Sequence, residues 1–342
     1  MRSMNYRTAG KCLMSVGCLS TSPTGAHSCA DGGCAPLPEN AAWETLKTKG
    51  EPVPRHEAAF VEFQGEFFLL GGRRIETVSV YNPQTQTWRQ ASKPPVEVHH
   101  FQPVVYGDQI LIICAMTKWF PNEVGLDRIL VYEPATDTWR WGDTIPEERR
   151  RGSAGVVLHE GKIYIVGGIV RGHQGGYVAW TDRYDPETGE WTILPDAPHA
   201  RDHFQCAEVD GKIYAAGGRR TSNETGQLFD LVVPEVDVFD IDTGTWSTLP
   251  QNLPTPRAGN STRAVGCQVL VLGGESMAQG RAHDEVEAWH VHKEFWQTLP
   301  PMNRGRHGTG HILYQNYIYT CSGSGGRGGG PELTSTERLM IQ

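Results

Sequence analysis

An internal repeat of about fifty residues runs through most of this chain of 342 residues. Each unit contains an apolar run that ends in two glycines or in an altered copy of them. The six runs are FFLLGG (67–72), ILIICA (110–115), IYIVGG (163–168), IYAAGG (213–218), VLVLGG (269–274) and IYTCSG (318–323). Such a period indicates a series of similar supersecondary units rather than one irregular core.

A spaced aromatic pair is the second feature of the repeat. In five units an aromatic residue is followed seven positions later by tryptophan: Tyr81 and Trp88, Tyr132 and Trp139, Tyr184 and Trp191, Phe239 and Trp246, Trp289 and Trp296. The residues between them include proline and Asx residues, as in YNPQTQTW (81–88), which favour tight connections between two strands. We therefore expect a strand pair in each unit and tryptophans that pack between units.

Four short strands account for the rest of each unit. An apolar run follows an arginine or histidine, a turn such as VDGK (209–212) comes next, and the run ending in glycine follows. A variable loop then leads to the strand pair that ends in tryptophan. No segment with helical periodicity interrupts this order, so the sequence predicts an all-β fold.

The double glycine followed by spaced tyrosine and tryptophan resembles the kelch repeat, and the resemblance covers residues 41–342. It implies a single six-bladed β-propeller with four-stranded antiparallel blades, a ring that leaves only short, protected sheet edges. The sixth unit ends at its third strand, TERLMIQ (336–342). We therefore expect an N-terminal strand, residues 41–46 with Trp43, to complete the last blade and close the ring.

Residues 1–40 differ in composition from the repeats, and we expect them to be a flexible leader or an export segment. Their apolar stretch is about five residues long, shorter than the roughly 7–15 residues of a signal-peptide core. The sequence thus leaves the cellular location open and slightly favours an extracytoplasmic one. No apolar run approaches the roughly 18 residues of a spanning helix, so we expect no membrane span.

The charge of the chain limits the class of partner. The formal net charge is −8 at pH 7, which argues against nucleic acid because phosphate binding needs a basic surface. We expect a monomer whose partners are neither nucleic acid nor membrane.

Arginines and histidines recur before the first strand of each unit and after the glycine pairs. Antiparallel strands alternate in direction, so both positions lie on one rim of the ring. Guanidinium groups in a concave mouth suit carboxylate, sulfate or phosphate groups. The sequence therefore predicts a site for an anionic saccharide or an acidic protein segment, formed by Arg55, His56, Arg73, His100, Arg151, Arg201, His203, Arg219, Arg257, Glu275, Arg306 and His307.

Each strand-start arginine also has a structural interpretation, since it can bond carbonyls or carboxylates of neighbouring blades. The doubled and tripled sites exceed what the repeat needs, and there we favour ligand binding: Arg73 and Arg74, Arg149–Arg151, Arg219 and Arg220. Aromatic residues of the same rim could stack on sugar rings or pack within loops: Trp119, Phe120, Tyr177, Trp180 and Phe229.

Metal chemistry is one route to catalysis. The copper-radical oxidases with kelch-type propellers, such as galactose oxidase, imply an adjacent Tyr-His pair that this sequence lacks. We expect no cofactor, with one alternative: a divalent metal ion on the propeller axis, held by histidines that begin four of the first strands. These are His56, His100, His203 and His307.

Metal-free proton transfer is the other route. The chain is similar to N-acetylneuraminate epimerase, a bacterial kelch protein, in blade count and N-terminal closure. The resemblance implies an arginine on the carboxylate of a sugar acid and a general acid and base such as Glu275 or Glu285, with a pKa raised by the enclosed mouth. No motif assigns these roles, so the catalytic residues stay unassigned. Ligand recognition is the favoured function, and a carbohydrate-acting enzyme, an epimerase, a mutarotase or a metal-dependent enzyme, is the alternative.

Overall fold

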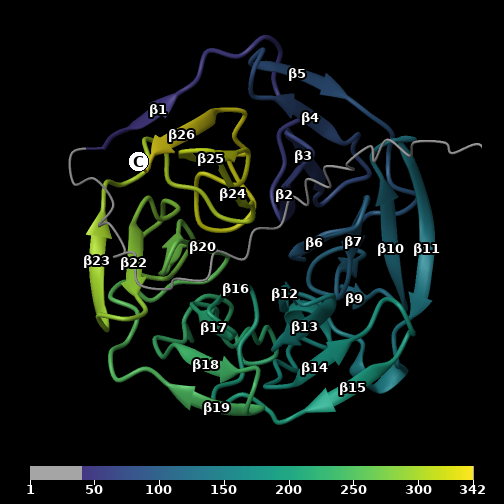
Figure 1. The fold of residues 1–342 in the computed structure, drawn as a ribbon, viewed down its shortest axis with the longest axis vertical. Helices are drawn as coiled ribbons and strands as arrows, with labels where there is room; N and C mark the ends of the chain where they lie inside the picture. The colour runs from purple at the N-terminus through teal and green to yellow at the C-terminus, as the bar shows by residue number, and fades with distance from the viewer. Residues whose placement is uncertain (1–40, 342) are drawn as a thin grey trace, which may run out of the picture.

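The computed structural model describes residues 41–341, which form six antiparallel four-stranded sheets. Figure 1 shows these sheets as blades around a central axis, visited by the chain in sequence order. The predicted all-β, six-bladed propeller is confirmed. Residues 1–40, where a leader or export segment is expected, lie outside the described residues, as does residue 342.

Five blades each take their four strands from one continuous stretch of chain. The first blade consists of β2 (Ala58–Phe63), β3 (Glu66–Gly71), β4 (Ser79–Asn82) and β5 (Thr87–Gln90). The second consists of β6 (Pro103–Tyr106), β7 (Gln109–Ile112), β10 (Arg128–Glu133) and β11 (Thr138–Thr144). The third consists of β12 (Gly155–His159), β13 (Lys162–Val166), β14 (Thr181–Tyr184) and β15 (Trp191–Leu194).

The fourth and fifth blades repeat this order. The fourth consists of β16 (Gln205–Val209), β17 (Lys212–Ala216), β18 (Asp237–Asp240) and β19 (Thr245–Thr248). The fifth consists of β20 (Ser261–Val265), β21 (Gln268–Leu272), β22 (Val286–His290) and β23 (Phe295–Leu299).

The sixth blade joins the two ends of the described chain. It consists of β24 (His311–Tyr314), β25 (Tyr317–Cys321), β26 (Thr336–Met340) and β1 (Trp43–Thr45). Trp43 pairs with Leu339 across β1 and β26, is buried, and donates from Nε1 to the carbonyl of Pro300 at 3.0 Å. The predicted closure by an N-terminal strand is confirmed, and Figure 1 shows β1 beside β26 at the edge of the ring.

Short elements in three loops complete the description of the chain. Strands β8 (Met116–Thr117) and β9 (Val124–Gly125) form a small hairpin between β7 and β10. Two 3-10 turns, η1 (Glu147–Arg149) and η2 (Gly172–Gln174), flank the third blade's first two strands. In the part of the chain that the structure describes, no helix has the length and apolarity needed to cross a membrane.

The spaced aromatic pairs lie directly opposite each other on the two outer strands of a blade. Tyr81 pairs with Trp88 and Tyr132 with Trp139, and their ring centroids are 5.0 and 4.6 Å apart. The three other pairs share this register. The hairpin turn explains the seven-residue spacing, because Asn82 caps it by accepting from the amides two and three positions ahead.

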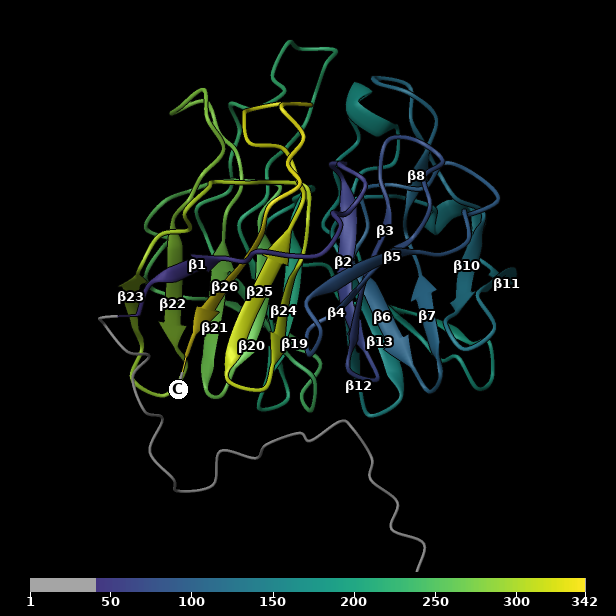
Figure 2. The same cartoon turned by 90° about the horizontal axis from the view of Figure 1, so that it is seen from above.

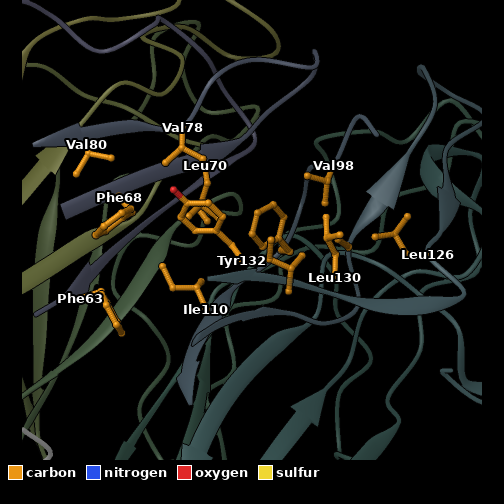
Figure 3. Packing of buried hydrophobic residues seen from close by; sticks show 14 residues of the cluster. Phe63, Phe68, Leu70, Val78, Val80, Val98, Ile110, Leu126, Leu130 and Tyr132 are labelled. Atoms are coloured by element: carbon orange, nitrogen blue, oxygen red, sulfur yellow. The ribbon is translucent and has the colours of Figure 1, made fainter. Parts of the chain in front are cut away.

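The hydrophobic core lies between blades rather than within one of them. Figure 3 shows Phe68, Leu70 and Val80 of the first blade facing Ile110 and Leu130 of the second, all of them buried. Similar clusters fill the other blade interfaces. The repeat therefore places each apolar face against its neighbour's, as a propeller requires.

A ring of backbone hydrogen bonds surrounds the axis. Just before each first strand stands one residue with a φ between 53° and 63°, the left-handed region: Glu57, His100, Ser153, His203, Gly259 and Gly308. The amide of each of the last five donates to the carbonyl of its predecessor in the preceding blade, at 2.6–3.1 Å. Gly308 in turn accepts from the amide of Ala58, so the ring closes. These six positions determine which side chains surround the axis.

The two faces of the disc differ in the length of their loops. Figure 2 shows long loops rising on one face, whereas short turns such as the one between β2 and β3 close the other. The loops that follow the glycine pairs belong to the long-loop face. The site described next is formed by these loops and by the axial ring.

Candidate functional site

Five arginines at the start of first strands are buried in their own blades: Arg55, Arg151, Arg201, Arg257 and Arg306. Each donates to the carbonyl of the first glycine of that blade's pair, or of Ser322 in the sixth blade. The guanidinium Nε of Arg257, for example, lies 2.6 Å from the carbonyl oxygen of Gly273. This bond explains why the arginine and the glycine pair recur together.

Buried carboxylates of the third strands neutralise four of these arginines. The pairs are Arg151 with Asp182 at 2.8 Å, Arg201 with Asp237 at 2.7 Å, Arg257 with Glu287 at 2.6 Å and Arg306 with Glu337 at 2.5 Å. None of the five arginines lines the central cavity described below. Their expected place in a ligand site is therefore corrected, because carbonyls and carboxylates of the blade already bind their guanidinium groups.

A cavity of about 560 Å³ opens on the long-loop face, and four of the other seven predicted residues line it. Of the predicted set, His56, Arg73, Arg219 and Glu275 line it. Its remaining lining residues are Glu57, Glu97, Trp119, Phe120, His173, Leu228, Phe229, Gly328 and Gly329. The volume is in the range of sites for small organic ligands, roughly 300–1,000 Å³.

The basic side chains of this cavity contact carboxylates. Arg73 Nη1 lies 2.7 Å from Glu123 Oε1, and Arg219 Nη1 lies 2.5 Å from Glu275 Oε1. The Nδ1 atom of His56 lies 2.7 Å from a carboxylate oxygen of Glu332. Both arginines of the cavity lining are thus paired, so the mouth expected to be cationic has no excess of positive charge, and hydrogen-bond donors and acceptors lie side by side.

Glu275 connects three segments of the cavity wall. Besides Arg219, it accepts from the amide of Gly328 at 2.7 Å, and its Oε2 lies 3.4 Å from Nε2 of His307. Burial raises the pKa of Glu275, but His307 and Arg219 outweigh it and lower the pKa to about 2. The expectation of a raised pKa is wrong for Glu275, which is an anion at neutral pH.

Glu285, the other candidate acid, shows the same reversal. Burial raises its pKa, but its own backbone amide and the neighbouring His283 lower the pKa by more. The net effect is a lowered pKa for Glu285. Nδ1 of His283 lies 2.9 Å from the Glu285 carboxylate. Neither glutamate therefore has the raised pKa that a general acid at neutral pH requires.

Aromatic side chains form two walls of the cavity. Trp119 is 76% exposed and Phe120 48% exposed on the β8–β9 hairpin. On another wall, two guanidinium groups lie over the ring of Phe229. The guanidinium carbon of Arg219 is 4.9 Å from the ring centroid, and that of Arg327 is 5.7 Å from it. Exposed aromatic faces beside hydrogen-bonding groups suit ring-shaped polar ligands.

Trp180, by contrast, lies outside the cavity lining. The guanidinium of Arg149 stacks on its ring at 4.3 Å, and Arg149 also pairs with Asp182. Tyr177 is 37% exposed and is likewise absent from the cavity wall. Loop packing is thus the role that the structure gives Trp180, and the tripled arginine site belongs to the blade.

Three histidines meet at the axial end of the cavity. The ring centroids of His100, His173 and His203 lie 4.7–5.3 Å apart, and the three side chains are buried. Burial lowers the pKa of His100 and His203 well below its usual value, so both rings are neutral at neutral pH. One ligating atom from each ring lies within 4.8 Å of the others, a donor set that suits a metal ion.

The structure places two of the four predicted axial histidines at the axis. His100 and His203 occupy the axial ring, whereas His56 and His307 stand one residue earlier in their repeats. His56 contacts Glu332, and His307 Nε2 donates to the carbonyl of Gly328 at 2.8 Å. A shift of one residue changes the direction of a side chain, which explains why these two histidines are elsewhere.

Sequence reasoning missed two members of the axial cluster. These are His173 and Glu123, which the sequence did not place with the axial histidines. Gly172 lets them meet: a Cβ there would lie 2.6 Å from the backbone and carboxylate oxygens of Glu123, and its φ is +54°. The one feature of the sequence that indicated this close contact was Gly172, the glycine beside His173 in an otherwise polar loop.

Comparisons with known proteins agree with the fold and the repeat. A family model described as the Attractin/LZTR1 beta-propeller matches residues 38–278. Kelch-like protein terF of Aspergillus terreus is 29% identical over 331 residues, which is 89% of this chain and 70% of terF. Kelch-like protein 40 of Xenopus tropicalis is 24% identical over 205 residues, or 57% of this chain and 32% of that protein. The chain thus spans most of terF but only about a third of the second relative.

A solved structure adds evidence on the architecture. The structure of YjhT aligns with a TM-score of 0.71, covering 84% of this chain and 95% of YjhT. The two sequences are 14% identical, so the likeness concerns the fold alone. What the central cavity binds follows from its own residues.

Proposed function

Since the chain belongs to the Attractin/LZTR1 β-propeller family, we propose for it a ligand-recognition function in which the central cavity binds a saccharide, either neutral or carrying a single acid group. The observation that carries the proposal is the presence of charge-balanced Arg-Glu pairs and exposed aromatic rings in one cavity.

The aromatic walls support a ring-shaped ligand. Trp119 and Phe120 reach the cavity from the second blade, and Phe229 reaches it from the fourth. Apolar faces of sugar rings stack on such side chains, while their hydroxyl groups need donors and acceptors at the edge. The paired Arg219 and Glu275 offer both kinds of group next to Phe229.

The ion pairs limit the charge of the ligand. Arg73 and Arg219 each have further N–H groups beyond the one that contacts a carboxylate, so they can still donate to hydroxyl or carboxylate oxygens. Glu57, Glu97 and Glu275 line the same cavity and oppose a polyanion. We therefore favour a saccharide over an acidic protein segment, which would bring many negative charges to a cavity whose arginines are already paired.

Calorimetric titration with a panel of ligands tests the proposal. The panel contains neutral mono- and disaccharides, uronic acids, sulfated oligosaccharides and an acidic peptide. We expect heat of binding from a neutral or singly charged sugar, and a loss of about tenfold in affinity in Phe229→Ala, equal to about 1.4 kcal/mol. Ile193→Ala is the matched control, because Ile193 is 60% exposed on the outer strand β15.

Two results contradict the proposal. One is binding of the acidic peptide with no response to any sugar. The other is an unchanged sugar affinity in Phe229→Ala, which would place the ligand outside the cavity. Proton NMR of the bound sugar then distinguishes recognition from catalysis, since an epimerase or mutarotase changes the anomeric or ring signals with time.

A further inference from the structure

His203 presents an unprotonated Nε2 to the axis. Its Nδ1 contacts the buried carboxylate of Asp202, which also accepts from the hydroxyl of Thr221 at 2.6 Å and from the amide of Thr221 at 2.9 Å. Both oxygens of this carboxylate already accept from Thr221, and Nδ1 of His203 contacts the oxygen that accepts from the hydroxyl, so the ring N–H on Nδ1 is the donor in this contact. The Nε2 atom is left with its lone pair.

His173 has the same arrangement on the other side. Its Nδ1 lies 2.9 Å from Oε1 of Glu123, a carboxylate that also accepts from Arg73 at 2.7 Å and from the backbone amide of His173 at 3.1 Å. The Nδ1 contact is poorly aligned for a hydrogen bond, but its length keeps the ring proton on the side of the carboxylate. Nε2 of His173 then faces Nε2 of His203 at 3.1 Å.

In His100, two successive hydrogen bonds through His99 also leave Nε2 without a proton. Nε2 of His99 lies 3.0 Å from the carbonyl of Lys118, which can only accept, so His99 carries its proton there. Nδ1 of His99 is then an acceptor, and Nδ1 of His100, 2.6 Å away, must donate to it. The buried Nε2 of His100 has no hydrogen-bond partner among the described residues, and a carboxylate oxygen of Glu57 lies 3.2 Å from it.

Three lone pairs and a carboxylate around one point repel one another unless a cation lies between them. We propose that His100, His173 and His203 bind a divalent first-row transition metal ion, such as Zn²⁺, through their Nε2 atoms, with Glu57 beside the ion. Imidazole nitrogens bind zinc at about 2.0–2.1 Å, so two of them 3.1 Å apart subtend an angle of about 100° at the metal. The three ligating atoms lie within 4.8 Å of one another, so the third ring moves inward when the ion binds.

The surroundings of the cluster match those of a metal site. A metal-bound histidine usually donates its other ring N–H to a carboxylate or a carbonyl, which fixes its tautomer. Here Asp202 and Glu123 serve two of the rings, and His99 with the carbonyl of Lys118 serves the third. Both carboxylates are buried, so they orient the rings rather than compete for the ion.

The open side of the cluster faces the cavity. His173 and Glu57 line the 560 Å³ cavity, while His100, His203 and Glu57 line a smaller axial cavity of about 40 Å³. Three imidazoles leave a coordination position free, as in zinc sites that bind a water or a substrate oxygen. One hydroxyl or carboxylate oxygen of the ligand takes that position if the ligand is a saccharide. This last statement rests on the proposed function.

Metal titration of the full chain tests the proposal without any sugar. The purified protein is stripped with a chelator and titrated with Zn²⁺ by calorimetry and with Co²⁺ by visible absorption. We expect one equivalent of Zn²⁺ with a dissociation constant below about 1 µM, and Co²⁺ bands of a low-coordinate imidazole site. Absence of binding by the wild-type protein overturns the proposal and leaves saccharide binding in the cavity unaffected.

Variants locate the ion. His173→Gln weakens Zn²⁺ binding by at least about 100-fold, and Asp202→Asn or Glu123→Gln weakens it by about 10–100-fold. His283→Gln is the matched control: His283 is buried and contacts Glu285 through Nδ1 but lies outside the cluster. Equal affinity in His173→Gln and in the control overturns the assignment. If a histidine variant does not fold, the Co²⁺ spectrum of the wild-type protein decides, since bands of a hexa-aqua type contradict imidazole ligation.

Discussion

Arg219 and Glu275 come from neighbouring blades and meet in the wall of the central cavity, with Nη1 of the arginine 2.5 Å from Oε1 of the glutamate. Both side chains are buried. The pair joins the loops of the fourth and fifth blades and cancels its own charge. A cavity built from such pairs recognises the shape and hydrogen-bonding pattern of a ligand more than its charge.

Glu275→Gln should change how stability depends on pH. The pKa of Glu275 is about 2 in the folded chain, against an ordinary value of 4.5. Because the folded value is lower, the ionised carboxylate stabilises the fold above about pH 4.5, and this contribution is lost as the pH falls toward 2. The difference in unfolding free energy between the wild type and Glu275→Gln is therefore largest at neutral pH and shrinks on acidification. Urea unfolding at a series of pH values measures it, and a constant difference contradicts the ion pair.

Arg257→Met should destabilise the fold without acting on the ligand site. It leaves Glu287 buried and unpaired, which costs about 3–5 kcal/mol. The double variant Arg257→Met, Glu287→Met should regain much of this loss, because no unpaired charge remains. Equilibrium unfolding gives the two values, and sugar affinity in the folded fraction should stay at the wild-type level. A weaker sugar affinity with normal stability would instead show that Arg257 takes part in ligand binding.

Trp43→Ala tests the closure of the ring. The buried indole packs in the cluster between the fifth and sixth blades, so its removal should cost about 3–5 kcal/mol. Removal of residues 41–46 should unfold the last blade. Hydrogen exchange should then accelerate at the amides of β26 and stay slow in β17. Equal acceleration throughout would mean that the ring does not depend on this strand.

Trp119→Ala should separate binding from folding. The side chain is 76% exposed, so the unfolding free energy should change by less than about 0.5 kcal/mol. The affinity for the bound sugar should nevertheless fall several-fold, because the indole forms one wall of the cavity. Thermal unfolding and calorimetry on the same sample measure both quantities. A large loss of stability with unchanged affinity would show that Trp119 supports its loop instead.

The fold could be predicted from the sequence because its signals are local. The aromatic pairs face each other across short hairpins, so their spacing carries the register directly. Trp43 could be assigned to the last blade because that blade lacked one strand. Both inferences need only the order of strands within a blade, which the repeat reproduces six times.

The site was harder to predict because side-chain direction depends on a single position. Counted from Arg201, the third residue, His203, faces the axis, and the same count from Arg55 gives Glu57 rather than His56. Aligning the repeats on arginine would have shown this shift. His173 and Glu123 come from loops of different blades, and no local pattern connects them. Their contact appears only once the ring is assembled.

The salt dependence of sugar binding tests the central claim most directly, namely that the ligand is recognised by a cavity whose arginines are already paired with carboxylates. Calorimetry on the full chain at about 0.05 M and about 0.5 M salt spans a large change in screening length. With the cavity cations already paired, the affinity should change by less than about twofold. A fall of tenfold or more between the two salt concentrations would show that free positive charge drives binding, and would contradict the account.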